Sequence, residues 1–333
     1  MISVIMATYN TSMFVAPAIE SILNQSFEKF ELIIVDDGST DNTLEIVRRY
    51  AERDTRIQVI QTEHGGASNA RNVGIQASKY PWIAIMDADD ISLPNRLEKQ
   101  ITAAKANSKI VALGAAVHHM NSKGEIFSVS RLGPETEEAF YRQRQEGHVV
   151  NLNHPTALLN KGVVLKVGGY NPQYNPQLEG TEDLELLDRM AEYGPVIALR
   201  EPLALYRVHS QSMSMQRFFL QRHSMRYVRA RHLAKLAGKR GPSLEDYFEE
   251  CRQRPLFSRL SKHLKTLGIF YYRKAGLFVC EKQYLQACFY IGMSAALNPK
   301  YSIPRVWKQV LSPEARQAID KVKQLKSSSE IGS

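Results

Sequence analysis

The first 120 residues alternate between short apolar runs and segments with helical periodicity. The apolar runs predict five strands, at residues 2–7, 30–37, 57–62, 82–90 and 110–117. The segments between them predict helices at residues 15–25, from residue 43, at 67–78 and at 95–107. Repeated strand–helix units are typical of a doubly wound, mainly parallel α/β sheet. Ligands of such sheets bind beyond the carboxyl ends of the strands, so chemistry is expected there.

The second half of the chain follows a different pattern. Residues 118–215 mix short strands and turns with a helical segment near 181–193, and from residue 216 the pattern is helical. Residues 275–299 are typical of a helix pair that turns near Lys282–Gln283, and their spacing resembles one tetratricopeptide-like unit. Because a single unit of this kind cannot bury its own face, we expect it to pack on neighbouring helices.

The net charge also changes sign near residue 216, where the helical pattern begins. The 333 residues carry a net charge of +9, with −6 over residues 1–215 and +15 over residues 216–333. Arg222, Arg226 and Arg229 recur at helical spacing on one side of a predicted helix. We therefore expect a catalytic part with a basic extension that favours an anionic membrane surface, the alternative being a solvated helical face. No nucleic-acid-binding motif accompanies these basic residues, so nucleic acid is not an expected partner.

Cysteine content and the apolar runs bear on the compartment. Three cysteines without a C-x-x-C motif make no disulfide framework, which favours a reducing compartment. The sequence enters a strand-like run at once, without the pattern of a signal peptide, and no apolar stretch reaches the roughly 18–20 residues that span a bilayer. We expect a cytoplasmic protein, peripheral at the inner face of the plasma membrane.

Polar side chains follow the first two predicted strands. Thr8, Tyr9 and Asn10 follow the first, and the second ends in Asp36 and Asp37. Adjacent carboxylates at the end of a buried strand are costly unless they accept hydrogen bonds. One interpretation of the sequence DDGSTD is a turn with a helix cap. The other is a site for a nucleobase, in which Tyr9 stacks on the ring and Asp37 accepts its N–H.

Carboxylates also follow the fourth strand and open a later helix. Asp87 and Asp89, in MDADD, could be turn residues, or they could bind a hard divalent cation that neutralises a diphosphate leaving group. Glu182 and Asp183 begin the predicted helix near 181–193. They could serve only the helix dipole, or one of them could be a general base held at a rigid helix start.

Together these motifs resemble those of the family 2 glycosyltransferases, which are inverting enzymes with the nucleotide-diphospho-sugar transferase (GT-A) fold. The resemblance covers roughly residues 1–215 and runs through VIMATYN, FELIIVDDGSTDNT, HGGASNARNVGI, WIAIMDADD, HPTALLNK, GGYNP, TEDLELLDRM and YRVHSQSMS, in family order. The chain departs from the commonest family pattern EDxDLWxR at Leu184, Glu185 and Leu187, which affects inferences about the acceptor side. Asp183 of that pattern is retained.

The resemblance implies a nucleotide-binding role for five residues. Tyr9 would stack on the nucleobase, Asp37 would accept a hydrogen bond from it, and Ala7 would line it. Arg71 would lie close to the nucleotide, and Asp87 near the ribose.

The resemblance also implies the catalytic and metal-binding residues. Asp183 would deprotonate the acceptor hydroxyl, with support from Glu182. Mn²⁺ or Mg²⁺ would bind Asp89, with Asp87 and His209 as further ligands.

The implied function is inverting transfer of a sugar from a nucleotide-diphospho-sugar, with UDP favoured, to an acceptor hydroxyl. The acceptor would be a carbohydrate or lipid-linked molecule in bacterial surface polysaccharide or glycolipid synthesis. The implied segments are a GT-A domain over 1–215, with its nucleotide-binding half at about 1–117 and its acceptor half at about 118–215, a basic helical extension over 216–323 and a disordered tail over 324–333.

Two alternatives stay open at this point. A sugar-phosphate nucleotidylyltransferase would want a glycine-rich, basic loop after the first strand, which TYNTSMF does not provide. A non-catalytic scaffold would bind a membrane or a partner through the basic tail.

Overall fold

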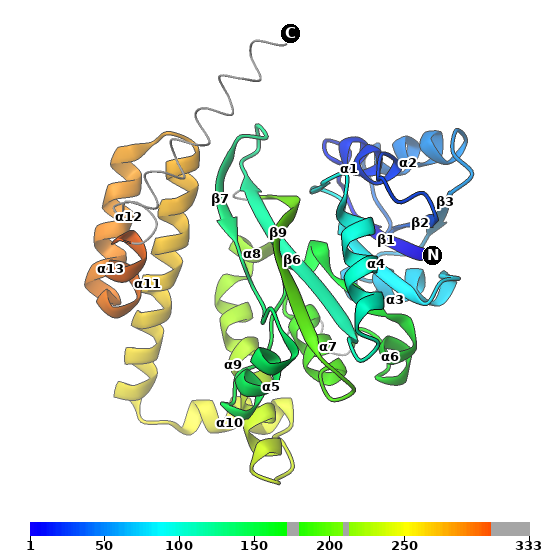
Figure 1. Cartoon of the computed structure of the whole chain (residues 1–333). Coiled ribbons are helices and arrows are strands. Elements are labelled where there is room, and N and C mark those ends of the chain that lie inside the picture. The colour runs from blue at the N-terminus through cyan, green and yellow to red at the C-terminus, as the bar shows by residue number, and fades with distance from the viewer. Residues whose placement is uncertain (172–179, 209–212, 308–333) are drawn as a thin grey trace. The chain divides into compact units, whose positions relative to one another are not determined.

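Figure 1 shows the computed structural model of the chain, which describes residues 1–171, 180–208 and 213–307. The chain divides into two compact units, Met1–Tyr247 and Phe248–Ser333. His209 and the tail over 324–333 lie outside the described residues.

Four parallel strands form the first half of the sheet. They are β1 (Ile2–Thr8), β2 (Phe30–Asp36), β3 (Ile57–Gln61) and β4 (Trp82–Asp87), in the order β3-β2-β1-β4. Every residue of β2 is buried, as its continuous apolar run predicted. Because the four strands run in the same direction, their carboxyl ends meet at one edge of the sheet.

Helices cover both faces of these strands, within a few residues of their predicted positions. They are α1 (Val15–Leu23), α2 (Thr43–Ala51), α3 (Ala67–Ala77) and α4 (Arg96–Ala106). The α/β fold class is therefore confirmed.

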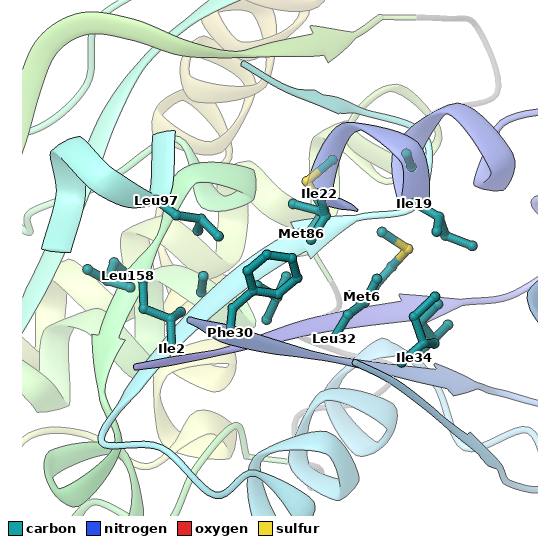
Figure 2. Packing of buried hydrophobic residues seen from close by; sticks show 14 of the residues in the cluster. Ile2, Met6, Ile19, Ile22, Phe30, Leu32, Ile34, Met86, Leu97 and Leu158 are labelled. Carbon is teal, nitrogen blue, oxygen red and sulfur yellow. The ribbon is translucent and has the colours of Figure 1, made fainter. Parts of the chain in front are cut away.

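One hydrophobic cluster fixes α1 and α4 to the sheet. Figure 2 shows this cluster, in which Ile19 and Ile22 of α1 and Leu97 of α4 are fully buried together with Met6 and Leu32 of the strands. Burial of side chains of this size stabilises the fold by about 1.5–3 kcal/mol each.

The opposite face of the strands is covered by α3. A Cβ atom added to Gly74 of α3 would lie 2.6 Å from Cγ2 of Ile5 in β1, so the glycine lets this helix approach the sheet closely. Arg71, in the first half of α3, reaches Asp87 at the carboxyl end of β4.

The second half of the sheet makes it mixed. It contains β5 (Ile91–Ser92), β6 (Ala112–Met120), β7 (Ile126–Ser130), β8 (Leu158–Asn160) and β9 (Val196–Arg207). The short β8 lies antiparallel between β4 and β6, and β9 runs parallel to β6. The predicted fifth strand is therefore present as β6 but does not pair with β4, because β8 returns from far along the chain to fill that place.

Further helices of the first unit surround β6 and β9. They are α5 (Glu137–Gln145), the 3₁₀ helix η1 (His154–Thr156), α6 (Lys161–Lys166), α7 (Glu182–Met190), α8 (Met213–Gln216) and α9 (Phe218–Leu236). The helix predicted near 181–193 is α7, and its residues Leu184, Leu187 and Met190 are buried.

Part of the positive charge of α9 is neutralised inside the first unit. Arg231 pairs with Glu185 at 3.0 Å, and Lys235 pairs with Glu192. Arg229 donates from Nε to the carbonyl oxygen of Gly147 at 3.2 Å. The first helix of the basic region thus binds α7 and the end of α5 with several of its cations.

The second unit is built from helices. After α10 (Leu244–Gln253), which spans the boundary between the units, come α11 (Leu256–Cys280), α12 (Tyr284–Leu297) and α13 (Pro299–Val306). The turn between α11 and α12, where Lys282 has a φ of 60°, confirms the predicted helix pair. Among the described residues, no helix is both long and apolar enough to cross a membrane.

Candidate functional site

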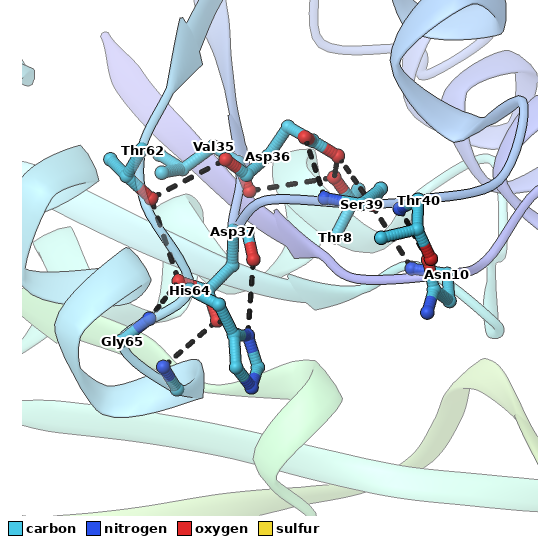
Figure 3. Close-up of polar contacts among 11 residues, drawn as sticks. Thr8, Asn10, Val35, Asp36, Asp37, Ser39, Thr40, Thr62, His64 and Gly65 are labelled. Carbon is cyan, nitrogen blue, oxygen red and sulfur yellow. Dashed lines mark hydrogen bonds and ion pairs between the residues drawn. The ribbon is translucent and has the colours of Figure 1, made fainter.

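Hydrogen bonds tie the ends of β1 and β2 together (Figure 3). Asp36 is fully buried and accepts from the hydroxyl of Ser39 at 2.6 Å and from its backbone N–H at 3.1 Å. Asn10 has a φ of 51°, a conformation that asparagine tolerates, and its Oδ1 accepts from the backbone N–H of Thr40 at 2.8 Å. Asp36 and Asn10 therefore stabilise the loops after β2 and β1, and Tyr9 directly precedes Asn10 in the second of these loops.

The carboxylate of Asp37 is buried and accepts hydrogen bonds from the loop after β3. Its Oδ1 accepts from the backbone N–H of Gly65 and its Oδ2 from that of Gly66, both at 2.9 Å. Nδ1 of His64 lies 3.0 Å from Oδ2 of the same carboxylate. These donors supply the hydrogen bonds that the adjacent charges of Asp36 and Asp37 require.

Tyr9 and His64 form an aromatic pair at this edge of the sheet. Their ring centroids lie 4.1 Å apart, with 23° between the ring planes, and Tyr9 is 44% exposed to solvent. The predicted stacking residue therefore lies beside Asp37, as expected from neighbouring strand ends. His64 was missed by the sequence analysis, although it stands at the start of the HGGASNARNVGI motif.

Arg71 of α3 joins the two halves of the first unit. Its Nη2 donates to Oδ1 of Asp87 at the end of β4, and its Nη1 donates to Oε1 of Glu182 at the start of α7, both at 3.1 Å. Burial disfavours the charge of Asp87, but the positive groups around it, Arg71 first among them, together lower the pKa of this carboxyl. Ala7 pairs with Asp87 in the register of β1 and β4 and so lies next to this cluster.

Asp183 lies beside Glu182 in the first turn of α7 and is half-buried. Burial, followed by repulsion from Glu182, raises the pKa of Asp183 to about 7. The backbone N–H of Leu184 donates to its Oδ1 at 2.7 Å and partly opposes this rise. A carboxylate with a pKa near neutrality is suited to exchange protons at physiological pH.

His154 and Tyr170 complete this cluster, and the sequence analysis assigned neither a role. Tyr170 is fully buried, its hydroxyl lies 2.8 Å from Nε2 of His154, and its ring lies 5.6 Å from the guanidinium carbon of Arg71. Burial and then the charge of Arg71 lower the pKa of His154 to about 3, so the imidazole is neutral. The only signals in the sequence were the motifs HPTALLNK and GGYNP.

The acidic segment after β4 is fixed from β9. Arg207 donates from Nε to the carbonyl oxygen of Asp89 at 2.8 Å, and from its backbone N–H to Oδ1 of Asp90 at 2.7 Å. Asp90 is fully buried, and its Oδ2 has no hydrogen-bond partner among the described residues. Asp89 is half-buried, so its carboxylate remains the more accessible of the two.

A metal ion would find few ligands from the protein alone here. The described residues contain no group of three or more His, Cys, Asp or Glu side chains that could hold a metal ion. The orphaned buried oxygen of Asp90 beside the carboxylate of Asp89 fits a hydrated, hard cation that takes its remaining ligands from water and phosphate.

Comparison with known proteins decides the family. The model of glycosyl transferase family 2 matches residues 3–168. An O-antigen biosynthesis glycosyltransferase of Escherichia coli, WbnJ, is 34% identical over 222 residues, which are 64% of this chain and 81% of that protein. The chain belongs to glycosyltransferase family 2. An uncharacterized glycosyltransferase of Methanocaldococcus jannaschii is 29% identical over 70% of this chain and 79% of that protein.

Solved structures support the same fold for this family 2 member. Crystal structures of Staphylococcus aureus TarS in complex with UDP and with UDP-GlcNAc both align with a TM-score of 0.52. Their identities are 19% and 18%, and each alignment covers about nine-tenths of both chains. The predicted GT-A fold is therefore confirmed, and glycosyltransferase is the activity class of this chain. Neither the nucleotidylyltransferase nor the scaffold alternative is favoured.

Proposed function

We propose that this chain is an inverting glycosyltransferase that uses a nucleoside-diphosphate sugar, with UDP preferred, and an acceptor hydroxyl. The observation that carries the proposal is the position of Asp183 at the start of α7, next to Glu182 of the Arg71 cluster, where burial raises its pKa to about 7. That cluster links the end of β4, where a nucleotide of this fold binds, to the helix that carries the base. The proposed base, Asp183, therefore directly follows the residue of this cluster that is paired with Arg71.

Asp183 acts as the general base in this proposal. It removes the proton of the acceptor hydroxyl, and the oxygen attacks C1 of the donor sugar from the face opposite the nucleotide. The bond from C1 to the diphosphate oxygen breaks, the nucleoside diphosphate leaves with the bonding electrons, and the proton remains on Asp183. One such displacement inverts the configuration at C1, and holding both substrates in line supplies much of the rate.

The proposed donor site lies at the carboxyl ends of β1, β2 and β4. Tyr9 stacks on the base, Asp37 accepts from it, and Ala7 lines it. Arg71 and Asp87 lie beside the ribose and the diphosphate. The crystal structures of TarS in complex with UDP and with UDP-GlcNAc support a uridine nucleotide as the first donor to test.

Asp89 is proposed as the residue that holds Mn²⁺ or Mg²⁺, with Asp87 and His209 as further ligands. Such a cation, when bound, would neutralise the negative charge that develops on the departing diphosphate. Arg207 fixes the backbone of Asp89 and therefore holds its carboxylate at the end of β4.

The acceptor is proposed to be a carbohydrate or lipid-linked molecule of a bacterial surface polysaccharide. The O-antigen role in the name of the Escherichia coli relative supports this setting. The charge of +15 over residues 216–333 supports a place at the anionic inner face of the plasma membrane, where lipid-linked acceptors are found.

A donor screen tests the proposal. The full chain is incubated with UDP-, GDP- and dTDP-sugars, with and without Mn²⁺, and its melting temperature and nucleotide release are measured. A UDP-sugar should raise the melting temperature most, and only with the metal present. The proposal fails if no nucleotide sugar stabilises the protein or is consumed.

A further inference from the structure

The first ten residues of α11 present an apolar face to solvent. Leu256, Phe257, Leu260 and Leu264 have exposed fractions of 77%, 84%, 52% and 37%. At about 100° per residue, these four side chains fall within a sector of about 100° on the helix surface. A contiguous exposed face of large apolar side chains marks an interaction surface.

This face does not belong to the core of the second unit. The buried residues of α11 begin at Thr266 and continue through Gly268, Ile269, Ala275 and Cys280. Asn298, at the end of α12, donates to the carbonyl oxygen of Lys265. The segment 256–265 therefore precedes the part of α11 that packs against α12 and α13.

The charge around the face has one sign. Residues 256–265 contain Arg259, Lys262 and Lys265 and no Asp or Glu, whereas the preceding Arg252 and Arg254 pair with Glu249 and Glu250 of α10. By the same angular count, Arg259 and Lys265 lie on either side of the apolar sector and Lys262 lies opposite to it. An apolar face bordered by cations on both sides is typical of helices that lie in the headgroup region of a membrane.

We propose that residues 256–265 bind the surface of an anionic lipid bilayer. The four apolar side chains enter the boundary between headgroups and acyl chains, and Arg259 and Lys265 contact lipid phosphates. A second copy of this chain fits the face less well, because pairing two such faces would bring their bordering cations together. These residues are not the cations of α9 that bind α7. The proposal rests on the membrane placement proposed above and names the segment responsible for it, but it does not depend on the sugar transfer.

Co-sedimentation of the full chain with vesicles tests this surface. One set of vesicles contains phosphatidylcholine alone, and the other contains phosphatidylcholine with phosphatidylglycerol. The protein should sediment with the anionic vesicles at low salt, stay in solution with the neutral ones, and be released from the anionic ones at high salt. If the full chain ignores anionic vesicles at low salt, the proposal is wrong.

Variants assign the binding to α11. The double variant Phe257→Ser with Leu260→Ser should reduce vesicle binding by roughly tenfold or more. The double variant Arg259→Gln with Lys265→Gln should bind less tightly and with a weaker dependence on salt. Leu285→Ser is the matched control, because Leu285 of α12 is 87% exposed in the same unit but lies outside this face, and binding should be unchanged.

Two results would overturn the assignment. One is binding of both double variants at the wild-type level, with melting curves that show folded protein. The other is a loss of self-association in Phe257→Ser with Leu260→Ser, measured by sedimentation without vesicles, which would assign the face to a second copy of the chain.

Discussion

The imidazole of His64 lies flat on the ring of Tyr9, with 4.1 Å between the ring centroids. Its Nδ1 lies 3.0 Å from the carboxylate of Asp37 and 3.1 Å from the carbonyl oxygen of the same residue. Because both of these atoms are acceptors, Nδ1 must carry the proton. A flat ring that stacks on Tyr9 and donates to Asp37 is also what the proposed donor site requires of a nucleobase. His64 therefore occupies the place proposed for the base.

Removal of the His64 ring should strengthen nucleotide binding. In His64→Ala the proposed base site needs no displacement of a side chain, so the dissociation constant for UDP should fall, as measured by calorimetry with Mn²⁺ present. Tyr9→Ala should weaken binding by about tenfold or more, since stacking of a base on an aromatic ring contributes about 1–3 kcal/mol. Tyr141→Ala, at a similarly exposed tyrosine of α5, is the control and should change nothing. Weaker UDP binding in His64→Ala would show that His64 contacts the bound nucleotide and does not occupy the place of its base.

Arg71 should contribute to the free energy of unfolding as well as to the arrangement of the site. Arg71→Ala leaves the carboxylates of Asp87 and Glu182 without their shared cation, which should lower the free energy of unfolding by about 2–4 kcal/mol. Arg49→Ala is the control, because Arg49 pairs with Glu45 at 3.7 Å on an exposed helix face and should contribute no more than about 0.5 kcal/mol. Urea unfolding of both variants measures the difference. Equal midpoints for the two variants would contradict a structural role for the Arg71 cluster.

The strand ends could be located from the sequence because repeated strand–helix units predict a mainly parallel sheet. Parallel strands end on the same side of a sheet, so Tyr9, Asp37 and Asp87 could be expected near one another from the sequence. The contact between Arg71 and Glu182 could not be derived from periodicity, because it joins residues 111 positions apart. It depends on where α7 packs on the finished sheet.

The contacts of the site that the sequence did not predict are made by segments far apart along the chain. η1 and β8 insert beside β4, and this brings His154 close to Tyr170 and the charge of Asp87. Arg207 reaches Asp90 from the end of β9, 117 residues along the chain. Neither residue has a local pattern that predicts its partner. Only the family motifs marked them.

The rate of transfer should depend on Asp183. Asp183→Asn keeps the size of the side chain but removes the proton acceptor, so it should bind UDP normally and lose roughly 10²–10⁴-fold in turnover. In the wild type, kcat/KM should rise with pH through an apparent pKa near 7, because the base must be ionised. Glu45→Gln, on the exposed face of α2, should leave both properties unchanged. Turnover near the wild-type level in Asp183→Asn would place the base elsewhere, with Glu182 the next residue to test.

The same carboxyl should make the fold less stable at neutral pH than in mild acid. Folding raises the pKa of Asp183 from 3.8 to about 7, so the folded state holds a proton that the unfolded state has released. This contribution to stability is fully present below pH 4 and is lost as the pH rises through 7. Asp183→Asn cannot ionise, so at pH 8 it should be more stable than the wild type, on the order of 1–2 kcal/mol after allowance for the partial exposure of Asp183.

Melting temperatures of the two proteins between pH 4 and pH 8 measure this effect. The gain in Asp183→Asn should be largest at pH 8 and should shrink steadily toward pH 4, where Asp183 of the wild type is protonated in the folded protein. A variant that melts below the wild type at pH 8 would show that the ionised carboxylate is stabilised by its surroundings. The proposed base would then have an ordinary pKa, and the acid limb of the rate profile would have to belong to another group.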